Sequence, residues 1–313
     1  MRPAASKGQW DLSYEACVFG FVPGKGMTFA KEKVRSDLEI FKKTGVRWIC
    51  IVGINPLEPL VPMGYNLQEV ICMAKEWIEE LGLKVSSFHY SSPTFAPLNA
   101  GQDSAREILV KNVELFKIWE PKSFVVHPVW IMGENSNPGM SQKFDLEVAE
   151  HGEKEVLRVI AGNLKIMGKQ AAKYGIKLAI ENLGKLGGSQ KDYAPLFVKM
   201  IDEPNVGYCI DSGHAHCSGL AVPNLIRQAG SRLFETHFHD NRGPDYGDEH
   251  MPVGFGTISW LDVITALKEV NFPGPVTFET EGWSIPDRAE GYIQAMAWWR
   301  ACEQKAQAIK SKG

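Results

Sequence analysis

The sequence lacks several features that mark particular classes of protein. No run approaches the roughly 18 consecutive apolar residues of a membrane span, so we expect no membrane association. The net charge of −3 gives no overall attraction to nucleic acid or to an anionic membrane. The polar segment Met1–Trp10 has no apolar core of a signal peptide. These absences favour a soluble, cytoplasmic protein.

Cysteine pairs and nucleotide-binding glycines are also missing. The six cysteines form no CxxC pair, and four of them lie inside apolar stretches, which is typical of reduced thiols in a cytosolic protein. The glycine-rich segment Gly20–Gly26 has neither the GxGxxG nor the GxxxxGK[ST] spacing of a nucleotide-binding loop. We therefore expect no nucleotide cofactor and interpret this segment as a flexible loop.

What the chain does contain is a regular alternation of short apolar strands with segments of helical spacing. Strands that alternate with helices pair in parallel, and eight such units predict a closed (β/α)8 TIM barrel, an α/β fold. We expect it to occupy residues 1–313 as a single domain, and a doubly wound open sheet is the structural alternative. The expected strands are Tyr14–Phe19, Trp48–Gly53, Lys84–His89, Ser123–His127, Lys177–Asn182, Val206–Asp211, Phe234–His239 and Val276–Glu281. The expected helices include Phe29–Thr44, Leu67–Leu81, Ala105–Trp119, Glu155–Tyr174, Trp260–Val270 and Arg288–Lys310.

One long segment, Trp130–Gly152, reads as irregular because it is rich in Gly, Asn, Pro and Ser. It follows the fourth expected strand, so we expect a long loop on the catalytic face of the barrel. The composition leaves open whether this loop is a substrate lid, a subunit contact or a disordered surface insertion.

Four neighbouring strands end on side chains that bind metal ions. Glu181, Asp211, His237 and Glu279 each follow a short apolar run, and the carboxyl ends of parallel barrel strands meet at one mouth. Three carboxylates and one imidazole form a hard shell that suits Mn²⁺, Mg²⁺ or Co²⁺, whereas additional histidines would favour Zn²⁺. A single carboxylate at a strand end is commonly part of an ion pair. Ligand residues at four consecutive strand ends favour a metal site.

Further polar residues lie near the same strand ends. Each of these side chains, taken alone, is more often a hydrogen-bonded polar group than a ligand, and for His216 we keep that structural interpretation. The candidates are His89, His127, His214, His239, Asp248 and His250.

The segments IEN, CIDSGH, HFHDN, DEHMPVGFG and FETE occur in this order and resemble the xylose-isomerase-like TIM barrel superfamily. That group contains sugar isomerases and epimerases together with the endonuclease IV family of apurinic-site nucleases. The resemblance extends over the whole barrel and is most specific from Glu181 to Glu281. It implies one divalent metal, with Mn²⁺ expected before Mg²⁺, Co²⁺ or Zn²⁺. The implied ligands are Glu181, Asp211, His237 and Glu279.

For the sugar enzymes, the resemblance implies a reaction through a metal-stabilised enediolate, in which Glu181 and Glu279 act as acid and base on a ketose or sugar derivative. It also implies substrate contacts by His214 and Arg242, and His239 is a further candidate for acid–base work. The remaining candidates for substrate contact are His89, His127, His250 and Trp260.

The same positions also match the ligand pattern of a nuclease. Endonuclease IV proteins hold three zinc ions with nine ligands, and the five positions beyond the core four are also filled here, by His89, His127, His214, Asp248 and His250. Two turns depart from the nuclease pattern, namely Ser212–His214 and Val253–Gly256. The segments Asn55–Asn66 and Tyr90–Gln102 contain no Lys or Arg, which argues against DNA as a partner because phosphate contacts dominate DNA affinity.

We therefore predict a metal-dependent sugar isomerase or epimerase with a small-molecule sugar as its partner. The alternatives are an apurinic-site endonuclease with a trinuclear zinc site, and a lyase or deglycosylase subunit that acts on an oxidised sugar glycoside with a small partner subunit. The last expected helix carries Met296, Trp298 and Trp299, which we expect to pack on the barrel; a homo-oligomer is the alternative.

Overall fold

Eight parallel strands form the core of the computed structural model, which describes residues 9–17, 20–22, 26–28, 31–54, 67–91, 94–129, 140–183, 192–280 and 285–310. The barrel strands are β1 (Leu12–Cys17), β4 (Trp48–Ile54), β5 (Lys84–Ser91), β6 (Ser123–Val126), β7 (Lys177–Glu181), β8 (Val206–Asp211), β9 (Leu233–His237) and β10 (Val276–Phe278). Their order in the sheet is β10-β1-β4-β5-β6-β7-β8-β9. The ring closes between β9 and β10, where Phe238 donates its backbone N–H to the carbonyl oxygen of Thr277 at 2.9 Å.

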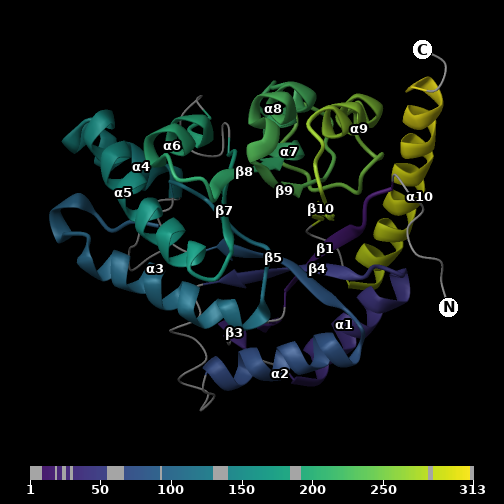
Figure 1. Cartoon of the computed structure of the whole chain (residues 1–313), viewed down its shortest axis with the longest axis horizontal. Coiled ribbons are helices and arrows are strands. Elements are labelled where there is room, and N and C mark those ends of the chain that lie inside the picture. The colour runs from purple at the N-terminus through teal and green to yellow at the C-terminus, as the bar shows by residue number, and fades with distance from the viewer. Residues whose placement is uncertain are drawn as a thin grey trace.

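Helices surround this ring of strands, as Figure 1 shows, and the predicted (β/α)8 barrel is confirmed. Gly45, Gly82 and Gly175, which follow three of the predicted helices, have φ angles of 90°, 69° and 71°, the left-handed conformation that ends a helix. The helices are α1 (Lys31–Thr44), α2 (Leu67–Glu80), α3 (Asp103–Phe116), α4 (Met140–His151), α5 (Glu153–Ala172), α6 (Ala194–Ile201), α7 (Ser212–Cys217), α8 (Val222–Ala229), α9 (Trp260–Glu269) and α10 (Ile285–Lys310).

The alternation of side chains along each strand decides what faces the barrel axis. Small residues such as Val125, Ala179 and Cys209 form a separate buried cluster inside the barrel, whereas Leu178 and Ile180 belong to the large apolar layer that includes the helices. Because side chains on a strand repeat every second residue, the residue two positions beyond an interior one also faces inward. Glu181 and Asp211 therefore face the axis, two residues after Ala179 and Cys209.

Two segments expected to be irregular contain regular structure. In the glycine-rich segment, β2 (Gly20–Val22) pairs in antiparallel fashion with β3 (Gly26–Thr28), so its interpretation as a flexible loop was wrong for these residues. Phe21 and Val22 favour a strand despite the flanking glycines.

Within the expected loop 130–152, residues 140–151 form α4, so that expectation was also wrong for this part. Except for Gly152, the Gly, Asn and Pro residues that suggested a loop precede Met140, and residues 130–139 lie outside the described part of the chain. Phe144 and Val148 lie one helical turn apart and pack on the core, which stabilises the helix. Glu147 also accepts a hydrogen bond from the backbone N–H of Leu98 at 2.9 Å.

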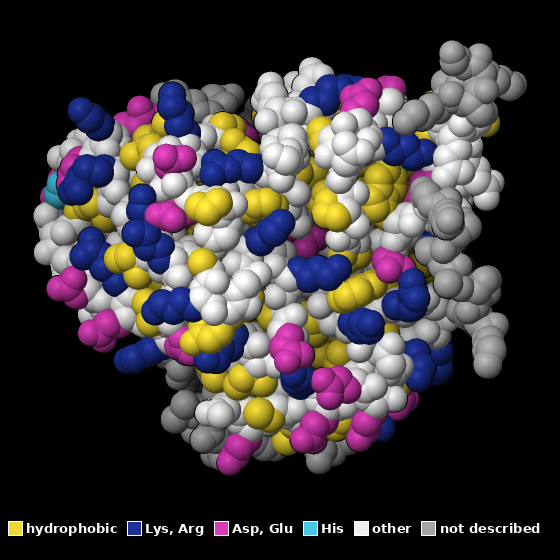
Figure 2. All heavy atoms as spheres, in the orientation of Figure 1, with side chains coloured by type: hydrophobic (Ala, Val, Ile, Leu, Met, Phe, Trp, Pro, Cys, Tyr) yellow, Lys and Arg dark blue, Asp and Glu magenta, His cyan; other side chains and the backbone are white. Residues whose placement is uncertain are grey.

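The last helix packs on the barrel through Trp299, as the sequence analysis expected. This side chain is fully buried, and its ring lies 5.6 Å from Phe278 and 6.2 Å from Trp10, measured between ring centroids. Its neighbour Trp298 is 51% exposed. Over the described residues, every helix is too short or too polar to cross a membrane. Side chains of both charge signs are interspersed on the face seen in Figure 2.

The two adjacent tryptophans give a matched test of this packing. Replacing Trp299 by Ala should lower the free energy of unfolding by about 3–5 kcal/mol, because a large side chain is removed from a closed core. The control Trp298→Ala should cost less than about 1 kcal/mol, since half of that side chain is already in water. Urea unfolding of both variants measures the difference, and equal costs would contradict the described packing of α10.

Candidate active site and metal centre

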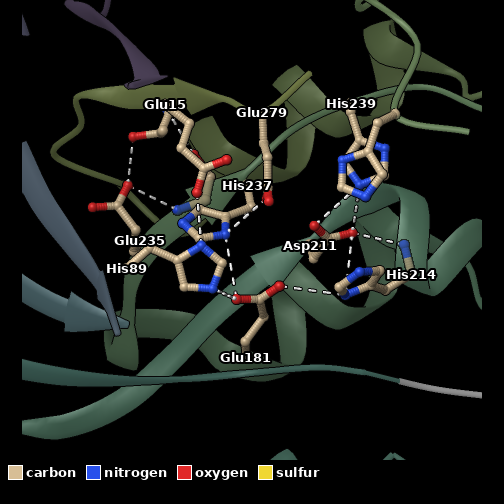
Figure 3. A network of polar contacts seen from close by, with 12 residues as sticks. Glu15, His89, Glu181, Asp211, His214, Glu235, His237, His239 and Glu279 are labelled. Atoms are coloured by element: carbon tan, nitrogen blue, oxygen red, sulfur yellow. Dashed lines mark hydrogen bonds and ion pairs between the residues drawn. The ribbon is translucent and has the colours of Figure 1, made fainter. Parts of the chain in front are cut away.

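The four side chains predicted to form a metal site converge at the carboxyl ends of the strands (Figure 3). Glu181, Asp211 and His237 are the last residues of β7, β8 and β9, and Glu279 follows β10 directly. One ligand atom from each lies within 4.8 Å of the others, and all four side chains are buried. His237 Nδ1 is 2.9 Å from Glu279 Oε2 and 3.3 Å from Glu181 Oε2, so the imidazole lies between the two glutamates.

The polar atoms of this core group are short of hydrogen-bond partners. Apart from the ion-pair contacts with imidazoles, none of four such atoms makes a hydrogen bond of normal geometry among the described residues: both carboxylate oxygens of Glu181, Oε2 of Glu279 and Nδ1 of His237. A buried polar atom without a partner costs free energy, and a divalent cation at the centre of the group would supply the missing interaction. The residues present therefore fit a metal ion.

Electrostatics keep the two glutamates ionised. Complete burial opposes the charge of Glu181, but the imidazoles of His237, His127 and His89 hold its pKa well below the usual value. Burial likewise opposes the charge of Glu279, and His237 lowers the pKa of that carboxyl group too. Both side chains are thus carboxylates, the form that binds a cation or removes a proton.

A pair of imidazoles adjoins this core group at Glu181. The Nε2 atoms of His89 and His127 lie 3.1 Å apart, and each is 3.4 Å from Glu181 Oε2. These three residues form a second set that could hold a metal ion.

A third set of ligand atoms lies on the other side of Asp211. His214 Nε2 and His250 Nε2 are 3.2 Å and 2.7 Å from Asp248 Oδ2, and the His239 ring stacks on His250 with centroids 3.9 Å apart. Burial opposes protonation of His250, but its hydrogen bond to Asp248 raises its pKa to about 10. The structure therefore brings all nine predicted ligand positions, and His239 with them, to one mouth.

His239 supports Asp211 from outside the core group. Its Nε2 lies 3.1 Å from both carboxylate oxygens of Asp211, and its backbone N–H and carbonyl group both hydrogen-bond with the hydroxyl of Ser212. The ring occupies the space beside Gly213, where a Cβ atom would lie 1.8 Å from Cε1 of His239. Glycine at this position is therefore required for the imidazole to reach Asp211.

Two residues that were predicted to contact the substrate bind to other side chains of the protein instead. Trp260 is only 3% exposed, and its indole N–H donates to Asp240 Oδ2 at 2.7 Å, so our interpretation of this residue as a sugar contact was wrong. Its indole belongs to the apolar core around Trp299, and the aromatic residue type alone could not reveal this. The guanidinium of Arg242 pairs with Glu249 and stacks on Tyr246; among the described contacts of Arg242, none is with the core group.

His216 agrees with its structural interpretation. Its Nε2 hydrogen-bonds to Thr257 Oγ1 at 2.8 Å, away from the three ligand sets.

Two buried glutamates inside the barrel were not predicted from the sequence. Glu15 on β1 is 1% exposed and pairs with His89, and burial together with the charge of Glu279 raises its pKa to about 7. Glu235 on β9 is 2% exposed and accepts hydrogen bonds from Thr277 Oγ1 and Ser123 Oγ at 2.8 Å and 3.2 Å. An acidic residue within an otherwise apolar strand was the available signal for both.

The close contact at Gly213 generates a prediction with an internal control. Gly213→Ala should displace His239 from Asp211 and weaken the binding of Mn²⁺ by at least about tenfold, since residues that support metal ligands commonly contribute this much. The control Gly162→Ala lies on α5, where an added Cβ meets no atom within 4 Å, and it should leave Mn²⁺ binding unchanged. Calorimetric titration of Mn²⁺ into the metal-free variants measures both affinities. Equal affinities would show that the contact between His239 and Asp211 does not support the metal site.

The sequence has relatives among sugar isomerases and epimerases. It is 34% identical over 117 residues to an uncharacterised protein of Methanocaldococcus jannaschii, a match that covers 36% of this chain and 39% of that protein. It is 24% identical over 220 residues to the D-psicose 3-epimerase of Enterocloster bolteae, covering 69% of this chain and 67% of that enzyme. The chain thus spans about two fifths of the first relative and two thirds of the second.

Solved structures and a family comparison agree on the fold. The structure of 3-keto-D-glucoside 4-epimerase from E. coli superposes with a TM-score of 0.68 at 18% identity, covering 94% of this chain and all of that one. The IOLI protein with a bound zinc atom superposes with a TM-score of 0.67 at 17% identity, covering 95% of this chain and 99% of that one. Residues 38–302 match the family described as xylose isomerase-like TIM barrel. The chain belongs to this family.

Proposed function

We propose that this protein is a divalent-metal-dependent sugar isomerase or epimerase that acts on a ketose or a related sugar derivative. The observation that carries the proposal is the position of two buried, ionised glutamates, Glu181 and Glu279, on either side of His237 in one group with Asp211. The sugar epimerases among its relatives support the same class of reaction.

Glu181, Asp211, His237 and Glu279 would hold the metal. A bound divalent ion would polarise a substrate carbonyl and stabilise the charge that develops when the neighbouring carbon loses its proton. The oxygen-rich ligand set favours Mn²⁺, with Mg²⁺ and Co²⁺ as alternatives; Zn²⁺ is a further alternative because a zinc atom is bound in the IOLI structure.

The protein's own part in the reaction is the movement of a proton. One of the two glutamates would remove the proton from the carbon next to the carbonyl, and the other would return a proton, either to the opposite face or to the adjacent carbon. The first outcome is epimerisation and the second is isomerisation. Nδ1 of His214 lies 3.0 Å from the backbone carbonyl oxygen of Asn182, which holds the ring in place. His214 would bind a substrate oxygen at the mouth.

One observation favours a second candidate function. The nine candidate ligand positions that lie together at the mouth equal the number of ligands expected of a trinuclear zinc site, so an apurinic-site endonuclease is the competing function. Such an enzyme would use the metals to activate water for attack on a phosphodiester, and it would not exchange carbon-bound hydrogen with solvent.

Hydrogen exchange with solvent tests the proposal. The Mn²⁺-loaded protein is incubated in D₂O with a panel of ketoses that includes D-psicose, D-fructose and L-ribulose, and deuterium incorporation at carbon is measured by mass spectrometry. Glu181→Gln and Glu279→Gln should each reduce exchange by about 10²–10⁴-fold, because each removes an acid–base group.

The control is Glu303→Gln, a fully buried glutamate on α10 that bonds to Trp10 and Arg300, and it should retain exchange. Exchange at the unaltered rate in either active-site variant would exclude the mechanism with two glutamates. Cleavage of DNA at an abasic site, without exchange in any ketose, would instead support the nuclease.

A further inference from the structure

The side chain of Asn182 joins the ends of two neighbouring strands beside the core group. Asn182 directly follows Glu181, the last residue of β7, and it is only 1% exposed. Its Oδ1 accepts a hydrogen bond from the backbone N–H of Asp211 at 2.8 Å, and its Nδ2–H donates to the backbone carbonyl oxygen of Asp211 at 2.9 Å. Both polar ends of the amide are thus bound to one residue, and that residue is a member of the core group.

These two hydrogen bonds take over where the pairing between the strands stops. The ladder between β7 and β8 ends with the pair Glu181 and Cys209, two residues before Asp211. On the other side of β8, Asp211 is still paired with His237 of β9. Asp211 is fully buried, and buried backbone N–H and carbonyl groups need hydrogen-bond partners. On the side that faces β7, Asp211 therefore depends on the side chain of Asn182.

The contact sets the spacing of two carboxylates at the mouth. Asn182 is covalently attached to Glu181 and hydrogen-bonded twice to Asp211, so it links the strand ends that carry both acids (Figure 3). The carboxylate of Asp211 has a second fixed point, because its Oδ1 accepts from the backbone N–H of His214 at 2.6 Å. A divalent ion tolerates deviations of only about 0.2 Å in its ligand distances, so a shift of this strand end would weaken metal binding.

We propose that Asn182 is a positioning residue that holds Asp211 at the distance from Glu181 that a shared divalent ion requires. The use of the two carboxylates as metal ligands rests on the proposed function, whereas the placement of Asp211 by Asn182 does not. Because its amide is bound to Asp211, Asn182 acts through that residue and not on the substrate. Its backbone carbonyl oxygen also holds the ring of His214, so one residue orients a core ligand and a predicted substrate contact.

Metal affinity and the position of Asp211 test this role together. Asn182→Leu replaces the amide by an apolar group of similar size and removes both hydrogen bonds. It should weaken Mn²⁺ binding by about 10–100-fold, which is the usual effect of removing a group that orients a metal ligand, as measured by calorimetric titration of the metal-free protein. In crystals of metal-free Asn182→Leu, the Asp211 carboxylate should be displaced relative to Glu181 by about 0.5 Å or more.

Asn205 offers a matched control at the opposite end of the same two strands. It directly precedes β8, and its Nδ2 donates to the backbone carbonyl oxygens of Gly168 and Ile176 at 2.8 Å and 3.3 Å. Asn205→Leu likewise removes an amide that joins the chain before β7 to the start of β8, but it does so away from the mouth. This variant should lose stability and keep both its Mn²⁺ affinity and the position of Asp211.

Three results would overturn the proposal: an undisplaced Asp211 in metal-free Asn182→Leu, an unchanged Mn²⁺ affinity in that variant, or an equal loss of affinity in Asn205→Leu. Should Asn182→Leu fail to fold, Asn182→Ala removes the same hydrogen bonds without adding bulk. The unaltered protein gives a further test, because Asp211 should occupy the same position in crystals grown with and without Mn²⁺. A movement of this strand end on removal of the metal would show that the metal, and not Asn182, fixes it.

The measurements use no sugar, so they separate this role from the proposed function. A ketose panel without turnover would count against the proposed function and leave the result for Asn182 intact. If the unaltered protein bound no Mn²⁺, the proposed metal dependence would fail, and the position of Asp211 in the metal-free variants would still decide whether Asn182 places it.

Discussion

The attraction between buried carboxylates and imidazoles at the barrel mouth is the interaction on which the site depends. Charged side chains are costly to bury without partners, and here they are buried in alternating contact, with His237 between Glu181 and Glu279 and with His239 against Asp211. The arrangement still leaves both oxygens of Glu181 without hydrogen-bond partners. A cation at the centre of the group would supply the missing interactions, which is why we propose a metal centre rather than a set of structural ion pairs.

The barrel supplies this cluster through its regular geometry and holds it with a deeper polar layer. Every second residue of a strand faces the axis, so Glu235 and His237 occupy successive interior positions on β9. Below the mouth, Glu235 is held by hydroxyl groups and Glu15 by His89, so the layer that supports the ligands is itself polar. The absence of a side chain on Gly213 provides the space that His239 needs.

The fold, and the convergence of the four core side chains at one mouth, could be predicted from the sequence because both follow from local patterns. Apolar runs that end on Glu181, Asp211 and His237 identify the strand and its functional end together, since parallel strands in a barrel share one mouth. Seven of the eight predicted strands begin within one residue of the observed ones, and the remaining one, on β1, begins two residues late.

The other features depend on contacts between distant residues. Glu15 lies within an expected strand, where an acidic residue has no local explanation, and its partner His89 is supplied by a different strand. Trp260 looked like a sugar contact because of its residue type, but the orientation of α9 directs its indole to Asp240. The polar composition before Met140 concealed the apolar spacing of Phe144 and Val148 that makes α4 a helix.

We propose above all that Glu181, Asp211, His237 and Glu279 bind one catalytic divalent metal. Crystals of the protein grown with Mn²⁺ and measured at the manganese absorption edge test this claim most directly, because anomalous scattering locates the ion independently of the protein atoms. We expect one strong anomalous peak within bonding distance of all four side chains. A peak elsewhere, or no peak among these four residues at saturating Mn²⁺, would contradict it.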